Sequence, residues 1–162
     1  MALTSRFSLK IICIALLASF AGCGTTVVKA PPPEAVLAGT WSVVFDPPGY
    51  NESLVFDENG HVTERIIQFG SGVGSTTVTQ TNIHKSTSVD GAAVHIELVD
   101  TGTLLPGGST VPDCPLFQTC TVVFDGSIND ALNVISGRFS IQSTSANMTT
   151  STDQGGATLT KQ

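Results

Sequence analysis

The chain from Leu37 onward is divided into short stretches in which apolar and polar residues alternate, and Gly, Asp, Asn or Pro follows most of these stretches. Alternation with a period of two is typical of β-strands with one buried face, and no window holds a sustained helical period. The pattern therefore predicts an all-β domain. Its eight expected strands cover residues 40–46, 52–57, 61–68, 76–86, 92–99, 119–125, 132–141 and 156–161.

The connections between these strands are alternately long and short. Asn59-Gly60 and Asp90-Gly91 are suited to tight hairpins, because such pairs tolerate positive φ. In an up-and-down sheet, alternate connections lie at the same end, so the long loops should gather at a mouth and the tight turns at a base. We expect an eight-stranded antiparallel up-and-down barrel, because closure removes exposed sheet edges, with a two-sheet β-sandwich as the alternative.

The N-terminal stretch has the layout of a signal peptide. Arg6 and Lys10 precede the apolar residues 11–20, and the small residues Ala21 and Gly22 follow. The apolar run is shorter than the roughly 20 residues that a membrane-spanning helix needs. A buried N-terminal helix is the alternative, and the charged flank and the small-residue exit favour the signal peptide over it.

The residues Phe20-Ala21-Gly22-Cys23 resemble the bacterial lipobox. The resemblance implies that Cys23 receives a diacylglycerol group, that the peptide is cut before this cysteine, and that the new amino group is acylated. It also implies a place in the bacterial cell envelope, and Gly24 in place of Asp indicates the outer membrane rather than the inner one. Two or more acyl chains give stable anchoring to a membrane without a transmembrane segment.

Cleavage before Cys23 would divide the chain into three parts. Residues 1–22 are the expected lipoprotein signal peptide, residues 23–36 the lipidated N-terminus with a Pro-rich linker, and residues 37–162 the barrel domain. Three consecutive prolines favour a stiff, extended linker. The formal charge would fall from −6 to −8, because the peptide removes two basic residues and leaves thirteen acids against five bases.

Two cysteines remain when Cys13 is removed with the signal peptide and Cys23 carries lipid. Cys114 and Cys120 are separated by five residues, and two thiols in an exported chain most simply form a disulfide. This spacing differs from the two-residue spacing of redox motifs, which disfavours a catalytic dithiol, and a metal-binding pair is disfavoured equally. The sequence therefore predicts a disulfide between Cys114 and Cys120.

The residues Gly39-Thr40-Trp41, at the entrance to the first expected strand, are similar to the opening of lipocalins and their calycin relatives. In that family the Trp closes the base of the barrel, and a basic residue late in the chain covers it. The resemblance implies that Gly39 and Trp41 pack at the base of a lipocalin-like barrel. It also implies a covering basic residue, for which Arg138 is the candidate.

Several classes of function are disfavoured by the composition and the motifs. Only 12% of the residues are charged and the balance is acidic, so the chain has no basic surface for nucleic acid. His61, His84 and His95 fall in different strands and lack a zinc-ligand spacing. No Ser lies in a nucleophile-elbow motif, and acids such as Asp57 and Asp125 lie in or beside turns. We expect no catalytic residues, no metal site, no cofactor and no enzymatic activity.

The fourth expected strand is more polar than the others. One of its alternations contains Gln80, Asn82 and His84, which would be polar anchors in an apolar ligand cavity if they faced the barrel, and a solvent-facing or edge segment is the alternative. The leading hypothesis is a monomeric, membrane-anchored envelope lipoprotein that binds or carries a small apolar ligand in its barrel. The alternative is a filled barrel that serves as a structural or protein-interaction module, inhibitor-like, through its mouth loops.

Overall fold

A computed structural model of the chain describes residues 30–46, 51–70, 75–101, 103–104, 110–111, 114, 119–145 and 148–162. Cys23 and the expected signal peptide lie outside these described residues. The helical and extended elements belong to one compact unit, Pro31–Gln162.

The described residues form one 3₁₀-helix and eleven strands. In chain order these elements are η1 (Pro33–Leu37), β1 (Gly39–Asp46), β2 (Asn51–Phe56), β3 (Val62–Phe69), β4 (Thr76–Thr81), β5 (His84–Asp90), β6 (Ala93–Thr101), β7 (Thr103–Leu104), β8 (Thr110–Val111), β9 (Thr119–Ile128), β10 (Val134–Ser145) and β11 (Met148–Lys161).

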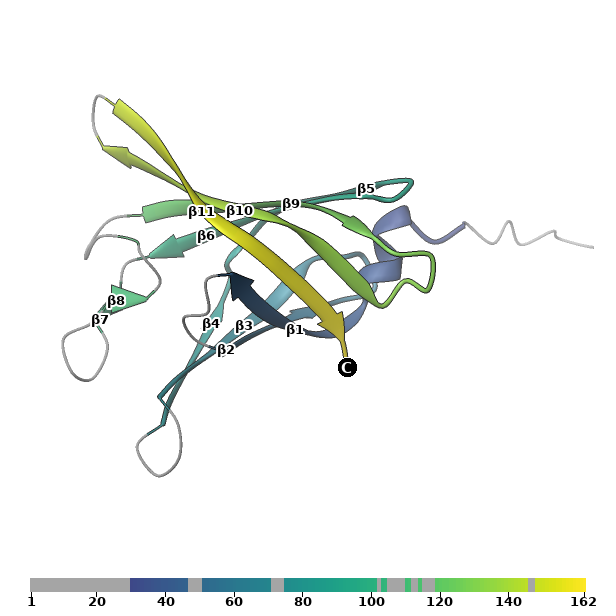
Figure 1. The fold of residues 1–162 in the computed structure, drawn as a ribbon, viewed down its shortest axis with the longest axis horizontal. Coiled ribbons are helices and arrows are strands. Elements are labelled where there is room, and N and C mark those ends of the chain that lie inside the picture. Colours follow the sequence, from purple (N-terminus) through teal and green to yellow (C-terminus); the bar gives the residue numbers. More distant parts are fainter. Residues whose placement is uncertain are drawn as a thin grey trace, which may run out of the picture. The chain divides into compact units, whose positions relative to one another are not determined.

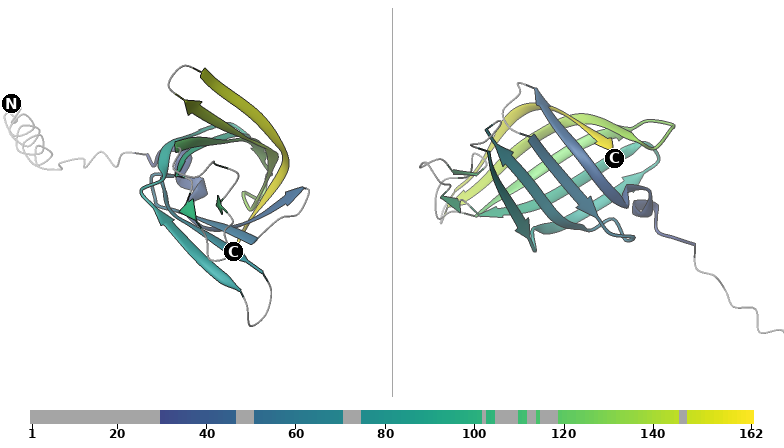
Figure 2. Two further views of the ribbon diagram at one scale, coloured as in Figure 1. Left: turned by 90° about the vertical axis from the view of Figure 1, so that its left-hand side faces the viewer. Right: turned by 90° about the horizontal axis from the view of Figure 1, so that it is seen from below.

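Nine strands form one antiparallel sheet in the order β4-β3-β2-β1-β11-β10-β9-β6-β5, and β7 pairs with β8 separately. The sheet curls around an axis (Figure 1), and it is seen end-on in the left view of Figure 2. The first and last strands of the sheet in chain order, β1 and β11, are hydrogen-bonded neighbours. The all-β, up-and-down architecture expected from the sequence is therefore confirmed, and the strands form one continuous sheet rather than the alternative sandwich.

The strand expected at residues 76–86 is divided in two. Asn82 adopts φ 57°, which interrupts the extended backbone between β4 and β5. β4 pairs with β3, whereas β5 pairs with β6. The other seven expected strands each correspond to one strand of the sheet, so the sheet has nine strands instead of eight. β4 and β5 are consecutive in the chain but form the two ends of the sheet, and they do not pair with each other. The sheet therefore does not close completely, and we call the gap between its two ends the open seam.

The segment before β1 closes one end of the barrel, which we call the base. We expected an extended linker as far as residue 36, but Pro33–Leu37 forms η1, whose first turn tolerates Pro because its N–H groups need no helical partner. η1 packs against β5, and the Glu34 carboxylate accepts a hydrogen bond from the Val89 N–H at 3.4 Å. Figure 2 shows η1, the C-terminus and the tight turns together at this end.

Trp41 is fully buried at the base and ties η1 to β1. Its indole Nε1–H donates to the Leu37 carbonyl at 2.6 Å. The Lys161 ammonium lies 5.5 Å from the centre of the Trp41 ring and donates to the Val36 carbonyl at 3.0 Å. Gly39, with φ 116°, brings the start of β1 close to the Lys161 side chain. A Trp covered by a late basic residue is therefore present at the base.

Arg138 was the wrong candidate for the covering residue. Its side chain is exposed on β10, and its neighbour Phe139 lines the barrel interior. Side chains alternate across a strand, so Arg138 points to the outer face of the sheet, away from the buried Trp41. Lys161 covers the indole because β11 pairs directly with β1, in a register that places Lys161 opposite Trp41.

Replacement of Trp41 by Phe should lower the free energy of unfolding by about 2 kcal/mol, because the core loses volume and the buried Leu37 carbonyl loses its donor. Urea denaturation of the two proteins measures the difference. The control is Val44→Ala on the same strand, because Val44 is 61% exposed and its loss should cost less than about 0.5 kcal/mol. Equal effects of the two substitutions would show that Trp41 does not hold the base.

Candidate functional site

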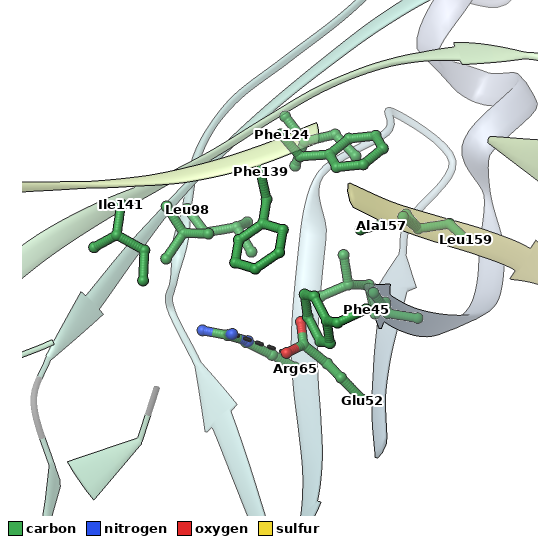
Figure 3. Close-up of a pocket in the computed structure, with 13 residues that line it drawn as sticks. Phe45, Glu52, Arg65, Leu98, Phe124, Phe139, Ile141, Ala157 and Leu159 are labelled. Carbon is green, nitrogen blue, oxygen red and sulfur yellow. Dashed lines mark hydrogen bonds and ion pairs between the residues drawn. The ribbon is translucent and has the colours of Figure 1, made fainter. Parts of the chain in front are cut away.

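The interior of the barrel contains a buried ionic network on its mouth side. Arg65 of β3, Glu52 of β2 and Asp100 of β6 are 2%, 5% and 0% exposed. The Arg65 Nη2 lies 2.8 Å from the Glu52 Oε2, and the Arg65 Nη1 lies 2.9 Å from the Asp100 Oδ2. The Gln80 amide donates to the Asp100 Oδ1 at 2.9 Å. Figure 3 shows Arg65 and Glu52 meeting among apolar side chains.

The network bridges the open seam. Arg65 and Gln80 lie on the β3–β4 side of the seam, and Asp100 lies on the other side at the end of β6. Near the middle of the barrel, the Val99 N–H donates to the Ile83 carbonyl at 2.6 Å. Side-chain contacts to Asp100 thus take the place of the missing ladder between β4 and β6.

Charge in the network is unequal, because one guanidinium faces two carboxylate side chains. Removing charged groups from water costs several kcal/mol each, and only close, well-oriented partners offset this cost. Arg65 meets both acids through separate nitrogen atoms, so its positive charge is engaged within the protein.

A small cavity lies beside this network. Its volume is about 30 Å³, and it is lined by Val43, Phe45, Glu52, Leu54, Arg65, Ile96, Leu98, Val122, Phe124, Phe139, Ile141, Ala157 and Leu159. The rings of Phe45 and Phe139, which both line the cavity, meet edge to face with 4.8 Å between their centres. Small-molecule sites usually measure about 300–1,000 Å³, so this cavity has room for water but not for a ligand of that size.

The three residues expected to line a ligand cavity are divided between two places. Gln80 points inward to Asp100, whereas Asn82 and His84 both line a surface hollow of about 460 Å³ at the break between β4 and β5. None of the three lines the interior cavity. The break at Asn82 is the reason, because it shifts the side-chain alternation that would have placed all three on one face.

His84 fastens the base side of the seam. The Val62 N–H of β3 donates to the His84 Nδ1 at 3.3 Å, and the His61 ring stacks on His84 with 4.5 Å between ring centres. Burial and the neighbouring His61 lower the pKa of His84, although Asp57 acts in the opposite direction. Backbone N–H groups of His61 and Asn59 donate to Asp57, and these bonds lower the pKa of its carboxyl.

His95 lies on the outer face of the sheet, where its Nδ1 is 2.6 Å from the Asp125 Oδ1. Its neighbour Glu97 accepts a hydrogen bond from the Ser86 hydroxyl at 2.8 Å, and this bond, together with Lys85, lowers the pKa of Glu97. Among the residues that the structure describes, no group of three or more His, Cys, Asp or Glu side chains is arranged to hold a metal ion.

The predicted disulfide is present. Cys114 and Cys120 are bonded, with 5.9 Å between their Cα atoms, and both are buried. They form a small apolar cluster with Ile141 and Val122 on the mouth side of the barrel. The disulfide therefore ties part of the longest connection to β9 and β10.

Sequence patterns could have revealed the network. Glu52 is in phase with Leu54 and Phe56 on β2, and Arg65 is in phase with Ile67 on β3. Charges that alternate in step with buried apolar residues must share their face. Asp100 follows Leu98 in the same way on β6, but no local pattern shows that the three charges meet.

No family model, curated protein or solved structure matches the chain. Within the described residues, no helix is long and apolar enough to cross a membrane.

Arg65→Met should lower the free energy of unfolding by about 3–5 kcal/mol, because it leaves Glu52 and Asp100 buried without their cation. The matched variant combines Arg65→Met with Glu52→Gln and Asp100→Asn, which removes all three charges. This triple variant should recover most of the loss in a urea titration. A single substitution that costs less than about 1 kcal/mol would contradict the assigned role of the network.

Lowering the pH should destabilise the protein through His84. Its folded pKa lies below its ordinary value of about 6.5, so the unfolded chain binds more protons in the window just below that pH. Stability should therefore fall as the pH decreases through this window, and His84→Gln should reduce that slope. Urea midpoints between about pH 5.5 and pH 7.5 measure it, and a comparison near pH 8 isolates any packing loss. Identical slopes would contradict the prediction.

Proposed function

We propose that the protein is a membrane-anchored envelope lipoprotein without enzymatic activity, whose filled barrel serves as a rigid module for interaction with another protein. The observation that carries this choice is the cavity of about 30 Å³ that the described residues enclose inside the barrel, which is far too small for an apolar cargo. The buried network adds to this argument, because its paired charges occupy part of the barrel interior and would be costly to separate. These features favour the filled barrel over the carrier.

The proposed anchor is the lipid on Cys23. Its support is the signal-peptide layout of residues 1–22 and the resemblance of Phe20-Ala21-Gly22-Cys23 to the lipobox. Residues 23–32 remain between that cysteine and η1, and ten residues reach at most roughly 30–35 Å. We place the protein at the outer membrane of a bacterial cell envelope, by the same resemblance.

The tether enters the domain at its base, because η1 leads directly into β1 there. The opposite end of the barrel holds the disulfide and the β10–β11 hairpin, which Figure 1 shows extending beyond the rest of the sheet. A short tether at the base keeps that end of the domain nearest the membrane. The mouth end is then the natural face for a protein partner.

Native mass spectrometry of the protein extracted from its own membranes tests both parts of the proposal. The intact mass should carry acyl groups on Cys23 and no retained small molecule. The Cys23→Ala variant should lack the acyl mass and leave the membrane fraction. A stoichiometric apolar molecule that survives extraction would instead support the carrier, and membrane-bound, normally processed Cys23→Ala protein would refute the anchor.

A further inference from the structure

The two end strands of the large sheet differ in how their outer edges are protected. η1 packs against β5, the Glu34 carboxylate accepts a hydrogen bond from the Val89 N–H, and the exposed Lys85 places a charge on that strand. For β4, the described residues provide β3 as a strand partner on one side and no strand on the other. The outer edge of β4 is therefore the less protected one.

The sequence of β4 lacks the devices that usually prevent pairing at an edge. Thr76–Thr81 reads Thr-Thr-Val-Thr-Gln-Thr, without a charged residue or a Pro, and its register with β3 contains no bulge. Natural edge strands are commonly blunted by lysines, prolines or bulges, because an uninterrupted edge is a template for another strand. β-branched residues, which make up most of β4, also favour the extended conformation.

We propose that the outer edge of β4 is a strand-addition site for an extended segment of another polypeptide, rich in β-branched residues and free of acidic side chains. Alternate residues of an edge strand direct their N–H and C=O groups outward, and an added strand pairs with them. Acidic side chains are disfavoured because the chain itself carries a formal charge of −6.

The seam determines where along β4 the segment can pair. The hydrogen bond between Val99 and Ile83 and the contact between Gln80 and Asp100 hold the two sides of the seam together toward the middle of the barrel. The Thr76–Thr79 part of the edge lies beyond these ties, toward the mouth. An added strand would therefore enter from the mouth, the end that the proposed anchoring leaves away from the membrane.

A second copy of the chain is a poorer occupant, and this step rests on the proposed function. Two β4 edges related by a two-fold axis pair antiparallel, and the axis reverses the direction from base to mouth. The two bases would then point in opposite directions. Tethers of residues 23–32, about 30–35 Å at most, could not anchor both copies to one membrane surface.

The probe for this proposal is a synthetic peptide, Lys-Thr-Thr-Val-Thr-Gln-Thr-Lys, acetylated and amidated at its ends. It is added to the mature protein in detergent, and amide hydrogen exchange is followed residue by residue. At about 1 mM peptide, exchange of the β4 amides should slow, whereas exchange of β10, an interior strand of the sheet, should not change. A peptide with alternate N-methyl groups, which cannot complete the ladder, should give no protection.

Two substitutions of the protein provide a matched pair. Thr79→Lys adds a charge to the exposed edge and should weaken peptide binding about tenfold. Ser136→Lys adds the same charge to an exposed position on β10, which is paired on both sides, and should change the affinity less than about twofold.

Several results would overturn the strand-addition site. These are no protection of β4, equal protection with the N-methylated peptide, or equal effects of the two lysine substitutions. A concentration-dependent dimer that Thr79→Lys abolishes would instead identify a second copy as the occupant. All of these measurements are made in solution and do not depend on the lipid anchor. Peptide binding can therefore be absent while acylation of Cys23 and the filled barrel are upheld. Peptide binding can also be present if acylation of Cys23 or the filled barrel is refuted.

Discussion

Asp100 is the residue through which the two sides of the open sheet are joined on the mouth side. It receives the guanidinium of Arg65 and the amide of Gln80, and both of these come from the far side of the seam. A closed barrel would connect the same strands through a backbone ladder. Here a fully buried carboxylate makes the connection, and its ionic partner Arg65 is buried as well. The curvature of the sheet at the mouth therefore depends on charges that would be costly if separated.

The base of the domain is held together mainly by apolar burial rather than by ion pairs. Leu37 and Trp41 are fully buried in the main apolar core, and the indole N–H satisfies the last carbonyl of η1. Lys161 adds a cation over the ring and a hydrogen bond to η1. Apolar burial tolerates small shifts of its members, whereas an ionic network requires its geometry. The mouth should therefore respond to single substitutions of charge, and the base to losses of volume.

Most of the fold could be predicted from the sequence, because strands with one buried face impose a period of two and their turns need particular residues. Asn59-Gly60 and Asp90-Gly91 lie in the tight turns expected of them, and both glycines adopt positive φ. The division at Asn82 could not be predicted, since Asn is also common in ordinary turns, which need not divide a strand between two partners. Whether the strand divides there depends on which neighbouring strand each half pairs with, and that depends on the arrangement of the whole sheet.

The residues of the site were harder to predict than the fold, for two reasons. Arg138 was assigned to the base from its position late in the chain, although it alternates with Phe139, which points inward. Alternation alone would have placed Arg138 outside. Glu52 and Arg65 alternate in phase with apolar neighbours, so their burial was visible in principle. The pairing of Arg65 with Asp100 was not, because residues 35 positions apart meet only through the sheet order.

The break at Asn82 also explains why an unprotected edge can persist in this protein. Asn adopts positive φ at little cost compared with β-branched residues, so the chain can leave β4 and begin β5 without strain that would favour re-pairing. Once it does so, β4 cannot continue along β6, because β5 already occupies the position beside β6 on the base side. Among the residues that the structure describes, no strand then covers the outer edge of β4, and Gln80 ties β4 to Asp100 across the seam. A strand that is already paired with β3 and tied to Asp100 should lose less conformational entropy on pairing than a frayed strand, and this supports the proposed strand-addition site.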